Sequence, residues 1–147
     1  MERASLREPC DRCSISDLLA RYCWMVDHGR WSEFGVCFTE DGEFHVRGEH
    51  LQGRASIIAY VRSSIGSYRL IRHLAHQPEV RVDGSSAAVR SYFELRGTTG
   101  WGTDFEALGV YEDTAVRQGD AWLLASRHVT FDYWVRRGEA FLTDAGS

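Results

Sequence analysis

The chain has 147 residues, of which 44% are hydrophobic and 26% charged, and this predicts one globular domain large enough to bury a core. Its formal net charge of −4 argues against nucleic-acid binding. The sequence contains no run of about 18 apolar residues, so no membrane-spanning helix is predicted. The polar first residues lack the apolar core of a signal peptide, so we expect a cytoplasmic protein without membrane partners.

Cysteine usage gives no sign of a metal or redox centre. Cys10 and Cys13 form a single C-x-x-C pair, and Cys23 and Cys37 are too far apart to form a second one. A structural zinc site generally needs a second pair or two closely spaced histidines. We therefore expect reduced thiols, with Cys23 packed as a small hydrophobic side chain, and neither a metal nor a cofactor.

Helical signals are concentrated in the first half of the chain. Residues 1–13 are expected to form a polar, loosely held arm, and Ser14 and Asp17 then give a helix-start pattern. Apolar residues follow at helical spacing until Gly29, which supplies a stop. The predicted helices cover residues 15–28, 31–38 and 56–64.

The second half of the chain alternates in the manner of strands. In residues 86–96 the odd-numbered positions from Ala87 to Leu95 are mostly apolar and share one face. Helices followed by hairpin-linked strands favour the α+β class over repeated βαβ units, and no glycine-rich phosphate loop follows a strand. The predicted strands cover residues 42–46, 69–75, 78–82, 86–96, 104–117 and 121–134.

Asp27 and His73 are the residues with the clearest potential for chemistry. Asp27 lies at the end of the first predicted helix, on the flank of its apolar stripe. His73 shares a strand face with Ile71 and Ala75, so its ring nitrogens need partners in an apolar setting. A carboxylate that holds one ring nitrogen leaves the other free as a general base. A core histidine and an unrelated helix-end aspartate would give the same pattern.

The other polar candidates are less distinct. Tyr22 lies on the same side of the helix as Asp27 and could donate a hydrogen bond to a substrate oxygen, or be a core tyrosine. In the last strand either Arg127 or His128 could reach the interior of the sheet. His45 and His50 flank a turn and are interpreted as surface residues, and the histidines show no recognisable metal-ligand spacing.

An ordered set of short motifs between residues 14 and 134 resembles SnoaL-like domains of the nuclear transport factor two-like superfamily. No single motif is specific, but their order is. The motifs are Ile15-x-x-Leu18-Leu19-x-x-Tyr22, Asp27-x-Gly29-x-Trp31, Phe38-Thr39-Glu40-Asp41-Gly42, Leu51-x-Gly53-Arg54-x-x-Ile57, Arg72-His73-Leu74, Pro78-x-Val80-x-Val82-Asp83-Gly84, Ala87-x-Val89-x-Ser91-Tyr92, Gly109-x-Tyr111-x-Asp113 and Gly119-Asp120-x-Trp122-x-x-x-x-Arg127.

The resemblance implies a cone-shaped α+β barrel, in which a bent, mixed or antiparallel sheet and three N-terminal helices surround an internal pocket. The domain would span residues 14–134, and residues 135–147 would form a tail that, with Trp134, could close the pocket. The exposed sheet face typical of this fold implies a homodimer or homotrimer. Residues expected to contact a small hydrophobic substrate are Cys23, Ile71, Phe93, Phe105, Tyr111, His128 and Trp134.

The dehydratase and dehydrochlorinase members of the superfamily carry a helix-borne Asp and a strand-borne His as their catalytic pair, and Asp27 and His73 fall at matching places. This implies a cofactor-independent dehydratase, cyclase or isomerase acting on a polyketide, terpenoid, steroid-like or xenobiotic molecule, with Tyr22 assisting. Two alternatives stay open. One is a ring-closing or epoxide-opening enzyme that uses carboxylates such as Glu94 or Asp104, and the other is a non-catalytic binding or assembly protein.

Overall fold

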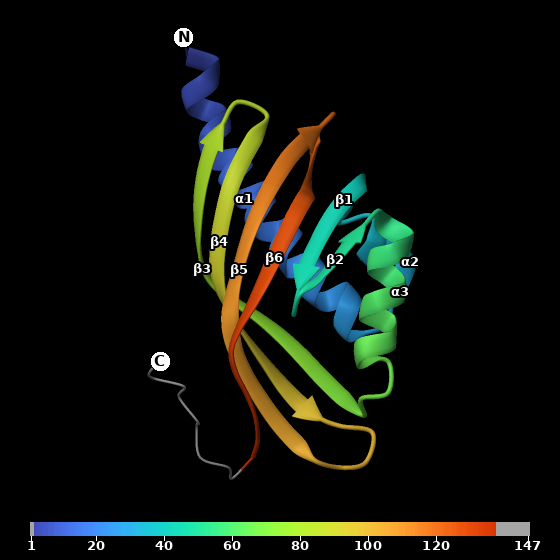
Figure 1. Cartoon of the computed structure of the whole chain (residues 1–147). Coiled ribbons are helices and arrows are strands. Elements are labelled where there is room, and N and C mark those ends of the chain that lie inside the picture. The colour runs from blue at the N-terminus through green and yellow to red at the C-terminus, as the bar shows by residue number, and fades with distance from the viewer. Residues whose placement is uncertain (1, 138–147) are drawn as a thin grey trace.

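The protein is an α+β fold in which three helices and one long, bent sheet enclose the core (Figure 1). A computed structural model describes residues 2–137, with side chains from residue 10 onward. The elements in chain order are α1 (Glu2–Asp27), α2 (Trp31–Gly35), β1 (Phe38–Val46), β2 (Glu49–Gln52), α3 (Arg54–Ile65), β3 (Leu70–Asp83), β4 (Ser86–Thr98), β5 (Asp104–Gln118) and β6 (Ala121–Arg136).

The six strands form a single mixed sheet in the order β2-β1-β6-β5-β4-β3. All neighbouring pairs are antiparallel except β1 and β6, which run parallel. The sheet therefore ends in β2 on one side and β3 on the other, and it bends without closing into a barrel. The predicted α+β class with a bent, mixed sheet and three helices is confirmed.

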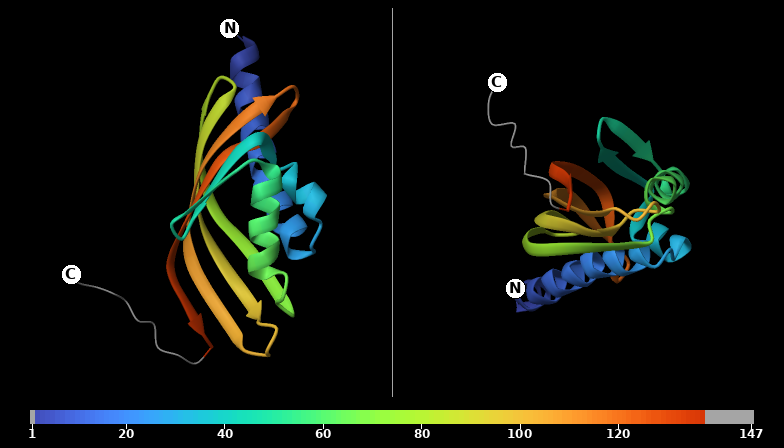
Figure 2. Two further views of the ribbon diagram at one scale, coloured as in Figure 1. Left: turned by 45° about the vertical axis from the view of Figure 1, so that its right-hand side comes forward. Right: turned by 90° about the horizontal axis from the view of Figure 1, so that it is seen from below.

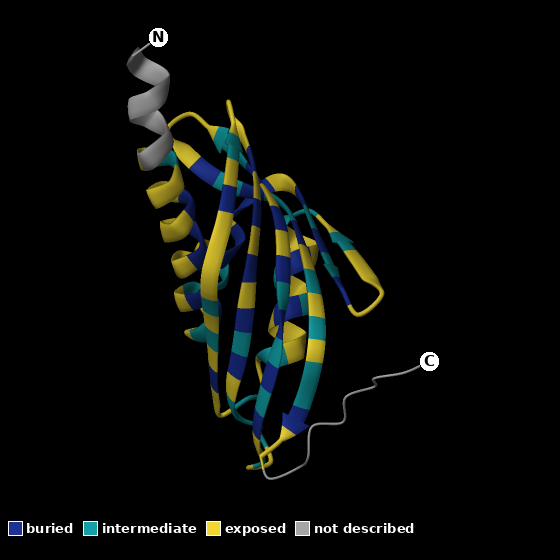
Figure 3. Ribbon diagram, turned by 90° about the vertical axis from the view of Figure 1, so that its left-hand side faces the viewer, coloured by how far each residue is buried: buried dark blue, intermediate teal, exposed yellow. Residues whose placement is uncertain are grey.

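The three helices lie on the concave side of the sheet, and α1 runs alongside β3 (Figure 2). Buried residues of β4 alternate with more exposed ones from Ser86 to Arg96, so Ala87, Val89, Phe93 and Leu95 face the helices as predicted. Figure 3 shows the same alternation as stripes across the strands. One face of the sheet thus builds the core while the other carries polar residues.

The first helix is longer than its sequence pattern suggests. It begins at Glu2, so residues 2–13, expected to form a loose arm, continue the helix instead. Contacts distant in sequence hold this segment, because Asp11 accepts hydrogen bonds from Trp122 Nε1 at 3.0 Å and from Arg117 at 3.2 Å. Arg12 donates to the backbone carbonyl of Val80 at 2.8 Å. Such tertiary contacts are invisible to local helix signals.

Several strand boundaries also differ from the predictions. β1 begins at Phe38 rather than at residue 42 and so includes the turn-forming residues 39–42, where its pairing with β6 shifts between Phe38 and Glu43. The two short strands predicted between 69 and 82 are one strand, β3, with an irregularity where Gln77 adopts a φ of 49°. In both cases an irregular strand carries the turn-forming residues without ending.

The end of the chain extends the sheet further than expected. β6 runs to Arg136, and Val135 is buried, so the predicted boundary at residue 134 falls inside a strand. Residues 138–147 of the predicted tail lie outside the described residues. No helix of the described part is both long and apolar enough to cross a bilayer.

Two groups of buried residues make up the core. The larger joins α1, α2 and α3 to the strands, and the smaller lies between β3, β4 and β5, around Phe93 and Tyr111. Both groups contact the partly buried Val129 and Phe131 of β6 and Ile65 of α3. The cavity described below lies where the two groups meet.

Candidate active site

The end of α1 presents Asp27 to the concave face of the sheet. The helix stops because Gly29 adopts a φ of +67°, a conformation that glycine reaches without strain. The preceding turn carries Tyr22, Cys23 and Val26, all buried against the strands. Asp27 is therefore the last residue of a well-packed helix, and its position is fixed by the packing of the turn before it.

The Asp27 carboxylate binds His73 of β3 at two points. Its Oδ1 lies 2.6 Å from the ring Nδ1 of His73. The backbone N–H of His73 also donates to the carboxylate, at 3.1 Å from Oδ1 and 3.0 Å from Oδ2. The side chains are only 5% and 8% exposed for Asp27 and His73. A carboxylate that accepts from Nδ1–H favours the tautomer whose Nε2 is free to accept a proton.

His73 also borders a cavity of about 110 Å³ that lies between α3, β1 and strands β3 to β6. Most of its walls are apolar or aromatic, and Asp27 is not among them, so the carboxylate lies behind the imidazole. The lining residues are Tyr22, Phe44, Val46, Arg47, Tyr60, Val61, Ser64, Ile65, Tyr68, Ile71, His73, Phe93, Leu95, Phe105, Tyr111, Val129, Phe131 and Trp134.

Tyr22 borders the same cavity. Its ring meets that of His73 edge-on at a centroid distance of 6.3 Å. Burial raises the pKa of Tyr22 to about 12, although the positive charge of Arg127 opposes this effect. Tyr22 is therefore protonated at neutral pH and is available as a hydrogen-bond donor.

A buried ion pair supports the two tyrosines of the site. The guanidinium of Arg127 lies 4.2 Å from the ring centroid of Tyr22 and 3.8 Å from that of Tyr111. It donates to both carboxylate oxygens of Asp113 at 2.8 Å. Burial by itself lowers the pKa of Arg127, but the Asp113 carboxylate outweighs burial and the net shift is upward. Arg127 therefore stays charged inside the core.

Five of the seven residues expected to contact a substrate line the cavity. They are Ile71, Phe93, Phe105, Tyr111 and Trp134. The other two do not. Cys23 is buried but lies outside the lining. His128 is exposed and lies on the opposite face of the sheet.

A strand irregularity explains the correction at His128. In β5, Thr114 and Ala115 pair with Ser126 and Leu124 of β6, so the pairing skips one residue. This bulge reverses the alternation along β6. Arg127 therefore points inward, and His128 outward, although the alternation from Trp122 and Leu124 favours His128 as the inner residue.

The carboxylates of the alternative mechanism also lie outside the cavity. Glu94 is partly exposed on the polar face and pairs with His76 at 2.9 Å. Asp104 is about half exposed, and it accepts a hydrogen bond from Thr98 at 2.8 Å. Neither lies among the lining residues, so neither can act on a molecule in this cavity.

Asp113 belongs to one of the sequence motifs, but the sequence analysis assigned it no role. Asp113 lies two residues from both Tyr111 and Ala115 along β5, and this spacing indicates that all three face the core. The cavity residues Tyr60, Ser64 and Arg47 have no such signal, because their contribution depends on how α3 and the turn after β1 sit over the sheet.

The fold and this site define an α+β protein whose bent, open sheet holds an apolar cavity with a buried carboxylate–imidazole pair in its wall. The model of the SnoaL-like domain matches residues 7–128, and the chain belongs to that family. The predicted membership is thereby confirmed.

Several individual proteins are similar to this chain at low sequence identity. The uncharacterized protein Rv2910c of Mycobacterium tuberculosis is 28% identical over 127 residues, which cover 84% of this chain and 86% of that protein. A candidate scytalone dehydratase from Novosphingobium aromaticivorans has a similar structure, with a TM-score of 0.82, 19% identity and coverage of 100% of this chain and 99% of that one. The hexachlorocyclohexane dehydrochlorinase LinA-type3 from Novosphingobium barchaimii gives a TM-score of 0.82, with 16% identity and coverage of 94% and 98%. At these identities the two structures establish the shared fold.

Proposed function

We propose that the protein is a cofactor-independent lyase that removes a proton and a leaving group from a small, largely apolar molecule, with His73 as the general base. The observation that carries this proposal is the Asp27–His73 pair, buried at the wall of an apolar cavity. A histidine held by a carboxylate on one nitrogen and bordering an apolar cavity has the arrangement needed for proton abstraction.

Each residue has a defined part in the reaction. His73 Nε2 takes the substrate proton, the electron pair of the broken C–H bond forms the double bond, and the leaving group departs with its own bonding pair. Asp27 fixes the orientation of the ring and stabilises the imidazolium that forms. Tyr22, a neutral phenol at physiological pH, donates a hydrogen bond to an oxygen of the substrate.

The cavity restricts the class of substrate. Its volume of about 110 Å³ is of the same order as the roughly 150 Å³ engineered cavity that binds benzene. Its walls are mainly aromatic, and Phe105 and Trp134 stack at 5.3 Å. The reacting part of the substrate is thus about one six-membered ring in size and apolar. The lining residues that carry a hydroxyl are Tyr22, Tyr60, Ser64, Tyr68 and Tyr111.

The shared fold of a dehydrochlorinase and a candidate scytalone dehydratase agrees with this class of reaction. Both names describe elimination from a small molecule, of hydrogen chloride in one case and of water in the other. They supply two probe reactions, and screening of related small molecules extends the search for the substrate of this protein.

The test is elimination activity in wild-type protein and in Asp27→Asn and His73→Ala variants. Chloride release from hexachlorocyclohexane and dehydration of scytalone are the first probes, followed by a set of small cyclic alcohols and ketones. For any substrate that turns over, each variant is expected to lose about 10² to 10⁴ in kcat.

A matched control separates the dyad from histidines in general. His76 also pairs with a carboxylate, Glu94, but on the polar face of the sheet, so His76→Ala is expected to keep wild-type activity. Full activity in the folded His73→Ala variant would exclude His73 as the base.

A further inference from the structure

Three histidines from three neighbouring strands stack on the polar face of the sheet, away from the cavity. His45 of β1 is directly opposite His50 of β2 and His128 of β6. The ring of His45 lies 4.1 Å from that of His50 and 4.0 Å from that of His128, with interplanar angles of 13° and 4°. The imidazoles therefore form a continuous stack across the three strands.

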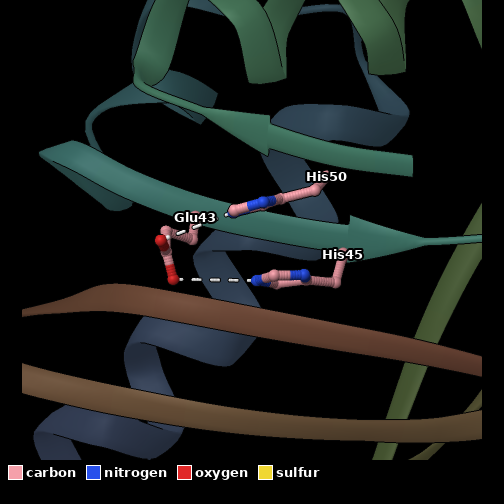
Figure 4. A group of neighbouring side chains, drawn as sticks. All are labelled: Glu43, His45 and His50. Carbon is pink, nitrogen blue, oxygen red and sulfur yellow. Dashed lines mark ion pairs between the residues drawn. The ribbon is translucent and has the colours of Figure 1, made fainter. Parts of the chain in front are cut away.

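Glu43 completes this cluster. It lies two residues before His45 and thus on the same face of β1. Its carboxylate oxygens are 3.7 Å from His45 Nε2 and 3.4 Å from His50 Nε2 (Figure 4). One ligand atom from each of Glu43, His45 and His50 lies within 4.8 Å of the other two.

These spacings suit a coordinated ion. Two ligands that each lie about 2.1 Å from a tetrahedral metal ion are about 3.4 Å apart. The two nitrogen–oxygen distances are already at or near this value. The rings of His45 and His50 stack nearly parallel, so one of them must rotate out of the stack for both Nε2 lone pairs to point at one ion. The side chains of His45, His50 and Glu43 are 29%, 51% and 41% exposed, so water can fill the remaining positions.

We propose that Glu43, His45 and His50 bind a divalent transition-metal ion of the zinc class. Two imidazoles and one carboxylate form a donor set preferred by such ions, whereas magnesium and calcium favour oxygen ligands. His45 and His50 show no metal-ligand spacing in the sequence, where they are expected at the surface, and only the pairing of β1 with β2 brings them together.

The position of the site gives it a structural consequence. His45 and His50 are on either side of the turn that joins β1 to β2, and that turn includes Arg47, which borders the cavity. β2 is short and has only β1 as its neighbour in the sheet. An ion shared by His45, His50 and Glu43 would clamp this edge strand to β1 and hold the turn at the cavity rim.

The experiment is a calorimetric titration of zinc chloride into the full chain, freed of any affinity tag and treated with a chelator. A Cys10→Ser/Cys13→Ser background removes the two exposed thiols, which also bind zinc. We expect one ion per chain and a rise in Tm of several degrees on adding zinc. The triple variant Glu43→Gln/His45→Ala/His50→Ala should lose the binding, and Glu43→Gln alone should weaken it about tenfold or more.

His76→Ala serves as the control, because His76 is another exposed histidine beside a carboxylate, and it should bind zinc as the cysteine-free background does. The substituted ligands are partly exposed, and circular dichroism checks that each variant is folded. Absence of a one-to-one zinc complex in the cysteine-free background would overturn the proposal. Equal zinc affinity in the folded triple variant would do the same.

Discussion

The carboxylate of Asp27 holds His73 by its ring and by its backbone at once, through Nδ1 at 2.6 Å and the backbone N–H at 3.0 to 3.1 Å. The two residues are 46 positions apart and join the end of α1 to an inner position of β3. The contact therefore fixes both the strand and the imidazole relative to the helix. Loss of the carboxylate should affect the orientation of the ring as well as its charge.

The first prediction concerns the tautomer of His73. In the wild-type protein, nitrogen-15 NMR of the neutral ring should show the proton on Nδ1, because the carboxylate can only accept. The amide introduced by Asp27→Asn can also donate, so this substitution should increase the population with the proton on Nε2. An unchanged tautomer ratio in the folded variant would show that Asp27 does not set it.

The second prediction concerns the ionisation of Tyr22. Because burial raises its pKa to about 12, tyrosinate absorbance at 295 nm should be the same in wild-type and Tyr22→Phe proteins up to about pH 11. A larger signal in the wild type near pH 10, with the fold intact, would contradict this burial effect.

The same shift gives a dependence of stability on pH. An unfolded tyrosine ionises near pH 10, so between about pH 10 and 12 the unfolded state binds fewer protons than the folded state. The stabilisation is complete below about pH 10 and is lost as the pH rises toward 12, by up to about 1.4 kcal/mol per pH unit. Urea unfolding should show a smaller decrease over this range in Tyr22→Phe.

The third prediction concerns the buried ion pair between Arg127 and Asp113, whose side chains are fully buried. Asp113→Ala leaves a buried guanidinium without its carboxylate and should lower the free energy of unfolding by about 3 to 5 kcal/mol. Urea denaturation measures this loss. Arg90 and Glu79 provide an exposed comparison, and Glu79→Ala should cost much less stability than Asp113→Ala, because water screens this ion pair. Similar losses in the two variants would contradict the assigned role.

The fourth prediction concerns Gly109, which faces the cavity wall from β5. A Cβ at this position would overlap the backbone carbonyl of Thr130 and the ring of Phe93. Gly109→Ala should therefore cost about 3 kcal/mol and displace Phe93, which stacks on Tyr111 at 4.3 Å. At Gly84, with a φ of +61° and open space around it, alanine should cost only about 1 to 2 kcal/mol. Equal stability losses in thermal unfolding would argue against the close approach at Gly109.

The fifth prediction concerns the reactivity of the four free thiols. Burial raises the pKa of Cys23 to about 11 and also raises that of Cys37, whereas Cys10 and Cys13 are exposed. Iodoacetamide at pH 8 should label Cys10 and Cys13 first, because the thiolate is the reactive form. Mass spectrometry of the peptides locates the label. Early labelling of Cys23 in the native protein would show that its site is open to solvent.

Much of the fold could be anticipated because its signals are local. Helical spacing and Gly29 predicted the end of α1 within a residue, and alternation in β4 predicted its inner face. The pairing of Asp27 with His73 was a hypothesis supported by a family resemblance, and the structure gives the hydrogen bonds that connect them. Local signals do not predict the start of α1. This part of the helix is held by contacts of Asp11 and Arg12 with distant strands, which no local pattern reveals.

The sequence by itself determined the α+β class, the helix that carries Asp27 and the strand face that carries His73, since periodicity and turn residues act over a few positions. Tertiary structure alone decided that Arg127 rather than His128 faces the core, because a one-residue bulge in β6 reverses the alternation. It also decided that His45, His50 and His128 stack, because strand register joins residues that no sequence spacing relates. Register and bulges result from the packing of the whole sheet, and no short segment of the chain specifies them.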